Sequence, residues 1–416
     1  MPKILIGKNF EAKSDAIKAL LKEDTKIDVN FLRSNYDKAG FDDFKNSAGV
    51  LITYYDDYKT FDYDGEKKTI IWKTMRKDVE DHLTISTQVI GVDKVFLDFD
   101  ASKFTTAPPL KPSSPFYAFD MKTSIGDDAP TNELVISAHL NKKDGVKAAE
   151  CRVNAYSPKK INLKVVILNK YNDDIQAIGL GKKADNKNIN CVTYGDNEKL
   201  DTKPQGDDKI YTYPDGRQSI TVGEDLICQT KVSKTFIFDS KNLEEELNKV
   251  YKQINVTWEI TYFDKVLVYY DAIINGGNDN GVADIKDGIT TEYSFIIKEV
   301  QKVVGEALPK KDRIAIIVNE FDDSGAVGLT IRGGQFAFVK LKQDDNEVMQ
   351  TIIHELGHTL NLEDLTTQFA SKNATKEDDK TNVMTYSYDK KASERLIFRK
   401  FQWTTLRSFM TGKFNP

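Results

Sequence analysis

Apolar and polar positions change their pattern twice along the 416-residue chain. In the first hundred residues, short apolar runs typical of strands alternate with segments of helical periodicity. The apolar runs lie at residues 3–6, 50–55 and 95–99, and the helical segments at 15–21 and 72–83. Strands that alternate with helices indicate a partly parallel sheet. We therefore expect a small α/β domain of unknown role over residues 1–110.

The middle of the chain favours strands alone. Its apolar runs at residues 133–140, 161–168, 219–222 and 234–238 are separated by turns rich in Asn, Asp, Gly and Pro. Short strands with regular turns predict an antiparallel, sandwich-like β-domain, here over residues 116–238. The segment 105–115 holds four of the chain's eleven prolines. Because such a stretch cannot continue a helix or a central strand, we place a domain boundary there.

The last part of the chain mixes helices and strands. Apolar residues at Leu243, Leu247 and Val250 form one stripe of a helix. Further helices are predicted at residues 290–304, from about 344, and at 394–410, with strands at 256–260, 313–318 and 335–339. We assign residues 239–416 to a third domain. The predicted fold class is therefore a multidomain α+β protein.

Two histidines and a glutamate in the third domain carry the candidate chemistry. His354, Glu355 and His358 form the pattern H-E-x-x-H. Residues four apart lie on one face of a helix, so both imidazoles can reach one metal ion. Glu355 can then reach a water on that metal without binding the metal itself. A catalytic zinc needs three protein ligands, and Asp364, six residues after His358, supplies a carboxylate for the third.

This spacing resembles the metzincin zinc peptidases. Their extended motif is H-E-x-x-H-x-x-G-x-x-H, and the snapalysin branch has Asp as the last ligand. Asn361 stands where the family has a glycine that ends the helix in a left-handed conformation, and Asn is the next most tolerant residue there. Downstream, residues 382–386 read Asn-Val-Met-Thr-Tyr, which resembles the methionine turn of serralysins and astacins. The resemblance is confined to the third domain.

The resemblance implies a zinc-dependent endopeptidase that cleaves protein or peptide substrates. Zinc would be bound by His354, His358 and Asp364, and Glu355 would be the general base. Tyr386 would donate a hydrogen bond to the developing oxyanion.

The resemblance also implies where the floor and the rim of the site lie. Met384 would pack beneath the metal and take no part in the chemistry. An extended peptide would bind as an added strand along the upper rim. The residues predicted to form this rim are Gln335, Phe336, Ala337 and Phe338.

Composition narrows the class of protein. A net charge of −5 without a basic stripe argues against a nucleic-acid partner, and no apolar run approaches the length of a membrane span. The first ten residues lack the apolar core of a secretory signal, so we expect export by a route that does not read one, or otherwise a cytoplasmic protein. An exported bacterial effector or toxin is one form of this hypothesis.

We expect the three cysteines and the two remaining histidines to have structural roles. Cys151, Cys191 and Cys228 are widely spaced and odd in number, which favours buried small hydrophobes over a disulfide framework. The alternative, a thiolate that blocks the zinc in a latent form, lacks a recognisable cysteine-switch motif. His82 and His139 have no ligand-spaced partner and are expected to be structural.

Two alternatives remain open from the sequence. Residues 278–287 resemble part of a calcium loop, with oxygen ligands at Asn278, Asn280, Asp284 and Asp287, or they form an ordinary polar turn. At the level of the whole protein, the first two domains could carry the main function as a delivery, adhesion or binding module for a target or secretion partner. The peptidase domain would then be cargo, or the N-terminal half would be a prodomain that keeps it latent.

Overall fold

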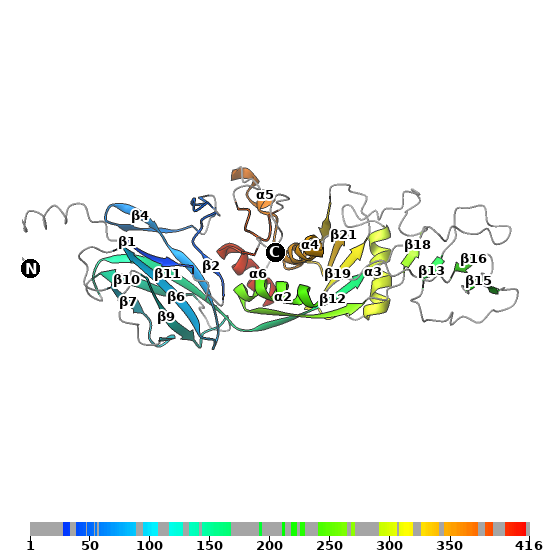
Figure 1. Cartoon of the computed structure of the whole chain (residues 1–416), viewed down its shortest axis with the longest axis horizontal. Coiled ribbons are helices and arrows are strands. Elements are labelled where there is room, and N and C mark those ends of the chain that lie inside the picture. Colours follow the sequence, from blue (N-terminus) through cyan, green and yellow to red (C-terminus); the bar gives the residue numbers. More distant parts are fainter. Residues whose placement is uncertain are drawn as a thin grey trace, which may run out of the picture. The chain divides into compact units, whose positions relative to one another are not determined.

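The structure is a computed structural model in which strands and helices both occur and strands predominate, so the mixed α+β class is confirmed. The residues it describes are 28–33, 39–46, 48–53, 55, 58–88, 95–106, 116–127, 133–140, 144–167, 191–193, 210–212, 218–222, 225–228, 240–263, 268–270, 291–305, 308–318, 326–340, 345–372, 379–385 and 396–412. The chain divides into two compact units, whose elements are labelled in Figure 1. Unit 1 comprises residues 1–45, 55–158 and 253–255, and unit 2 comprises 46–54, 159–252 and 256–416.

Unit 1 contains two larger sheets and a hairpin. The first sheet has the order β1 (Asp28–Leu32), β6 (Asp81–Gln88), β9 (Phe116–Thr123), β8 (Phe104–Thr106). The second has the order β2 (Phe41–Asp42), β5 (Ile71–Arg76), β11 (Lys147–Tyr156), β10 (Glu133–Leu140), β7 (Val95–Phe99). The hairpin joins β3 (Thr60–Tyr63) and β4 (Glu66–Thr69). All pairs are antiparallel except β5 with β11.

Alternating side chains from the two larger sheets meet in one core. Leu83 and Ile85 of β6 belong to the same buried cluster as Ile136 of β10 and Val153 of β11. This arrangement is a sandwich, in which each strand turns every second residue inward. Cys151 is fully buried in the same core, as expected of a small hydrophobe.

The helix predicted at residues 72–83 is wrong, because β5 and β6 occupy this segment. Trp72, Lys73, Thr74 and Met75 are all buried, so β5 shows no alternation of apolar and polar residues. Lys73 can be buried because its ammonium pairs with the carboxylate of Asp81, 3.4 Å away. Because both faces of β5 are covered, its sequence lacks the alternation typical of a half-buried strand, and such a segment is easily assigned to a helix.

The proline-rich segment 105–115 does not separate two domains. β8, which overlaps the first two residues of this segment, and β9, which follows it, pair antiparallel with each other. The described strands up to residue 106 and those of residues 116–156 therefore share one sandwich. The chain passes from unit 1 to unit 2 at residue 159, so residues 159–238 of the predicted middle domain belong to unit 2. The described residues before 110 contain strands only, whereas the predicted helix at 15–21 lies outside the described residues.

The two remaining histidines have structural partners in unit 1. Nδ1 of His139 lies 2.8 Å from the carbonyl oxygen of Gly145, at the turn between β10 and β11. His82 lies in β6 rather than in a helix, and its imidazole pairs with the carboxylate of Asp120 on the neighbouring strand β9.

Unit 2 is built on a five-stranded sheet. Its order is β17 (Val256–Phe263), β12 (Lys159–Ile167), β19 (Arg313–Val318), β21 (Phe336–Lys340), β20 (Gly328–Thr330). The first four strands are parallel to one another, and β20 runs antiparallel to β21 at the edge. The smaller sheets join β13 (Cys191–Thr193) with β18 (Val268–Tyr270), and β14 (Ile210–Thr212) with β15 (Gln218–Val222) and β16 (Asp225–Cys228).

The described chain from residue 240 onward also contains helices. They are α2 (Ser240–Tyr251), α3 (Thr291–Val304), α4 (Asp345–Thr359), α5 (Leu365–Gln368) and α6 (Lys400–Met410), with the 3₁₀ turns η2 (Lys252–Ile254) and η4 (Ala370–Lys372). Every residue of β19 is buried, as a central strand covered on both faces requires. α3 packs its Val300 against Ile314 and Ile316 of β19. α4 runs along β21 and β20, and it carries the candidate site.

Several elements of unit 2 lie where periodicity predicts them. β19 coincides with the strand predicted at 313–318, and α3 begins one residue after the predicted 290. α6 begins at Lys400, later than the predicted 394.

Among the described residues, no helix is long and apolar enough to cross a membrane.

Candidate metal centre

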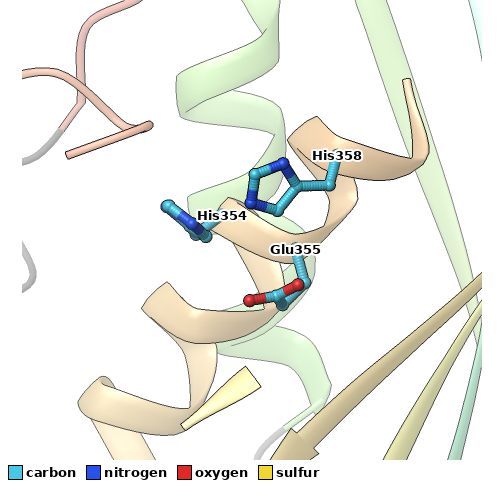
Figure 2. A group of neighbouring side chains, drawn as sticks. All are labelled: His354, Glu355 and His358. Atoms are coloured by element: carbon cyan, nitrogen blue, oxygen red, sulfur yellow. The ribbon is translucent and has the colours of Figure 1, made fainter. Parts of the chain in front are cut away.

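The candidate ligands project from one buried helix. In α4, Val348, Ile352 and Leu356 recur at a spacing of four and are fully buried, which fixes the face that packs inward. His354 and Glu355 are also buried, at 2% and 1% exposure. Figure 2 shows the side chains of His354, Glu355 and His358 leaving this helix, with the two imidazoles next to each other. The ring centroids are 4.8 Å apart and the ring planes are nearly perpendicular.

The end of α4 turns the chain back toward these histidines. Asn361 has φ 73°, the left-handed conformation expected for the residue in the glycine position of the motif. The N–H of Asn361 donates to the carbonyl of His358 (2.9 Å), and the N–H of Leu362 donates to that of Gly357 (3.0 Å). This pair of bonds is a Schellman motif, which satisfies the last carbonyls of a helix and reverses the chain.

The reversal brings Asp364 to the two imidazoles. Its Oδ1 lies 3.1 Å from Nε2 of His354 and 3.6 Å from Nε2 of His358. Ligand atoms about 2.0–2.1 Å from a tetrahedral zinc are separated by about 3.3 Å. The two measured distances bracket that separation, so Oδ1 of Asp364 is spaced from each imidazole nitrogen as two ligands of one metal ion would be. A carboxylate oxygen of Glu355 also lies within 4.8 Å of the imidazole nitrogens.

Backbone carbonyls fix the direction of both imidazoles. Nδ1 of His354 lies 2.9 Å from the carbonyl oxygen of Val383, and Nδ1 of His358 lies 2.8 Å from that of Leu362. A carbonyl only accepts hydrogen bonds, so each Nδ1 carries the proton and donates it. Each Nε2 is left to bind a metal, which is the usual arrangement behind a histidine ligand.

The electrostatics of the metal-free site follow from this geometry. Burial lowers the pKa of His354, but the hydrogen bond to Asp364 and the carboxylate of Glu355 outweigh it, so the pKa is raised. Burial raises the pKa of Asp364, but the hydrogen bond from His354 and the charges of His354 and His358 outweigh it, so this pKa is lowered. The site therefore favours a cation between these groups, either a proton or a metal ion.

Residues 382–385 belong to the segment predicted to form a methionine turn, and they contact α4. Met384 is fully buried. A Cβ added at Gly357 would lie 2.5 Å from Sδ of Met384, so only glycine permits this approach. Gly357 occupies a variable position of the motif, and the sequence alone did not single it out. Tyr386, the predicted oxyanion donor, lies outside the described residues.

A second glycine lies against the predicted general base. A Cβ added at Gly328, the first residue of β20, would lie 2.2 Å from Oε1 of Glu355. The backbone of β20 therefore lies directly against this carboxylate. Sequence reasoning missed Gly328 as well, because no motif contains it.

The predicted rim is corrected by the sheet order. β21 lies between β19 and β20, and its Ala337 and Phe338 are fully buried. Gln335 donates to the carbonyls of Pro309 (2.9 Å) and Asp312 (3.2 Å) and so braces a neighbouring loop. Phe336 packs against the core of the sheet with α3. Among the described strands, the one at this edge of the sheet is β20, which is too short to stand out in the sequence.

Two other predicted features cannot be placed. The calcium-loop candidate at 278–287 lies outside the described residues. Cys191 lies in β13 and Cys228 lies in β16.

No protein-family model and no curated protein matches this sequence. Among solved structures, the chain is similar to "Anomalous substructure of Titin-A168169", with 8% identity, 38% of this chain and 94% of that chain covered, and a TM-score of 0.16. It is also similar to "Tandem Ig repeats of Dlar", with 9% identity, the same coverages and a TM-score of 0.16. Similarities at these scores support no assignment of fold or function.

Proposed function

We propose that this protein is a zinc-dependent endopeptidase of the metzincin type. The observation that supports the proposal is the convergence of Nε2 of His354, Nε2 of His358 and Oδ1 of Asp364 at zinc-ligand spacing. The hydrogen bonds at both Nδ1 atoms give each imidazole the tautomer that a metal ligand needs. A pair of solvated surface histidines would require neither the Schellman turn nor the buried carbonyl of Val383.

The proposed mechanism assigns proton transfer to Glu355. Zinc, when bound, would lower the pKa of water toward neutrality and polarise the scissile carbonyl. Glu355 then accepts the proton of the attacking water and passes it to the leaving amine. Its burial keeps bulk water away from this carboxylate, so the proton is exchanged with substrate rather than with solvent. Tyr386 is proposed, from the sequence alone, to donate to the oxyanion.

The proposed substrate is an extended polypeptide. β20 presents a sheet edge beside Glu355, and an extended peptide can add to such an edge through its own backbone N–H and C=O groups. Backbone pairing makes no demand on side chains, so this edge suits a protein chain rather than one small amide. The identity of the protein substrate depends on side-chain subsites beyond β20.

Three proteins test the proposal: the wild type, Glu355→Ala, and Glu347→Ala as matched control. Glu347 lies on the same helix but is exposed. We expect about one zinc per chain in all three by elemental analysis. A proteomic cleavage profile should show products with wild type and Glu347→Ala, and a loss of at least about 10²-fold with Glu355→Ala. The proposal is wrong if wild type takes up no zinc, or if Glu355→Ala cleaves as fast as wild type.

A further inference from the structure

Four buried polar side chains downstream of the motif have no role in the chemistry proposed above. Asp379, Asn382, Arg399 and Gln402 are each at most 1% exposed. Nε of Arg399 donates to Oδ2 of Asp379 (2.8 Å), and Nη2 donates to Oδ1 (2.9 Å). Nδ2 of Asn382 donates to Oε1 of Gln402 (2.8 Å), and Nε2 of Gln402 donates to Oδ1 of Asn382 (3.1 Å). We call these four residues the turn-bracing network.

The network joins the methionine turn to the start of α6. Oδ1 of Asn382 accepts the N–H of Met384 (2.9 Å), which shapes the turn. Oε1 of Gln402 accepts the N–H of Arg399 (2.8 Å), which holds the first turn of the helix. Between them, the N–H of Val383 donates to the carbonyl of Ile397 (3.0 Å). The peptide groups around Val383 are therefore held from both sides.

The carbonyl of Val383 is the group that accepts from Nδ1 of His354. His358 differs, because its carbonyl partner is four residues away in the turn that ends its own helix. The partner of His354 is 29 residues away, and no local geometry fixes it. A remote carbonyl needs a rigid support if it is to orient an imidazole.

We propose that the turn-bracing network consists of positioning residues, which hold the Val383 carbonyl so that His354 keeps the Nδ1–H tautomer and directs Nε2 at the metal. Buried ionic and amide groups are a poor source of stability compared with apolar packing, and they are best explained where they specify one geometry. The consequence for metal affinity rests on the proposed function. The consequence for the tautomer of His354 does not, because it concerns the metal-free chain.

The test uses the full chain and replaces Gln402. Gln402→Met removes the amide at similar length, and Gln402→Glu keeps the Oε1 acceptor but loses the Nε2 donor. Asn248→Ala is the matched control, because the Asn248 amide makes two hydrogen bonds to the backbone of Trp258 (2.7 and 3.2 Å), also within unit 2. Asn248→Ala should lower the unfolding midpoint and leave His354 unchanged.

Two readouts separate positioning from stability. Nitrogen-15 NMR of the histidine rings distinguishes Nδ1–H from Nε2–H imidazole and so reports the tautomer of His354 in zinc-free protein. Four histidines are few enough to assign by single substitution. We expect Nδ1–H in wild type and Asn248→Ala, a mixture of tautomers in Gln402→Met, a smaller change in Gln402→Glu, and no change at His358. Competition with a zinc chelator should show affinity lowered about 10–100-fold in Gln402→Met.

The outcomes distinguish this inference from the proposed function. If both Gln402 variants lower the midpoint as Asn248→Ala does, yet keep the wild-type tautomer and zinc affinity, the network is only structural and the inference is wrong. If Gln402→Met does not fold, Gln402→Glu decides by the same readouts. If wild type binds no zinc, the proposed function fails, and the tautomer of His354 in the metal-free variants still decides the inference.

Discussion

Replacing Gly328 with alanine should displace the carboxylate of Glu355 without touching a metal ligand. The added Cβ would lie 2.2 Å from Oε1, 2.6 Å from Cδ and 2.7 Å from Cγ of Glu355. Ordinary contact begins near 3.4 Å, so the carboxylate must move by about 1.2 Å, or the strand must move by as much. A misplacement of about 1 Å at a reacting group can lower the rate about 10²-fold. We therefore expect Gly328→Ala to lose about 10²-fold in kcat.

The assay for this prediction measures zinc content, stability and turnover on the same preparations. Zinc content should stay near wild type, because the three atoms nearest to the added Cβ all belong to Glu355 and not to a proposed ligand. Thr330→Ala is the control, since it alters the same strand but adds no atom. The overlap should also destabilise the fold by about 1–3 kcal/mol. In a Glu355→Ala background the same glycine change should destabilise far less, because the clashing atoms are gone. Wild-type turnover in Gly328→Ala, or equal destabilisation in both backgrounds, would refute the reasoning.

Four further predictions follow from the same structure. Elemental analysis should show that His358→Ala and Asp364→Ala lose zinc, whereas Asp364→His keeps it. Glu363→Ala should also keep zinc, because the carboxylate of Glu363 pairs with Arg332. Gly357→Ala should lower the unfolding midpoint because the added Cβ overlaps the side chain of Met384, and adding Met384→Ala to it should recover part of that loss. An equal loss with and without Met384→Ala would contradict the 2.5 Å approach. Because the pKa of His354 is raised, its protonated form stabilises the metal-free chain below about pH 6.5, and this stabilisation is lost as pH rises through the raised value. Zinc must displace that proton, so the gap in melting temperature between zinc-loaded and chelator-treated protein should shrink on acidification, and a gap that widens would contradict the sign. A fragment of residues 240–416 should not fold by circular dichroism, because it lacks β12, which lies between β17 and β19.

Much of unit 2 could be predicted from local pattern. The strand 313–318 is a continuous apolar run because β19 is buried on both faces. The ligand spacing at 354, 358 and 364 follows from helical geometry and from one reversal of the chain. That reversal was also predictable, because Asn361 is the residue type that best replaces glycine in the left-handed region. These features depend on contacts within a few residues, which a single sequence records.

Features that depend on distant pairing were not predictable in the same way. Residues 72–75 of β5 do not alternate because Lys73 is buried against Asp81, and only the fold reveals that pair. The position of β20 beside β21 depends on which strand β21 pairs with, and a single sequence does not record that pairing. The boundary predicted at 105–115 rests on local composition, which does not record that β8 and β9 pair with each other.

The candidate site combines proposed ligands that a sequence motif contains with supporting residues that the motif does not contain. His354 and His358 share a helix, but their Nδ1 partners differ in origin: one carbonyl is local, and the other comes from the methionine turn. Gly357 lets that turn approach the helix, and Gly328 lets the edge strand approach Glu355 from another side. At both positions, the absence of a side chain on glycine allows a neighbouring side chain to lie close to the backbone. A substitution at either glycine should therefore act on the chemistry through geometry, even though neither residue can bind a metal or carry a proton.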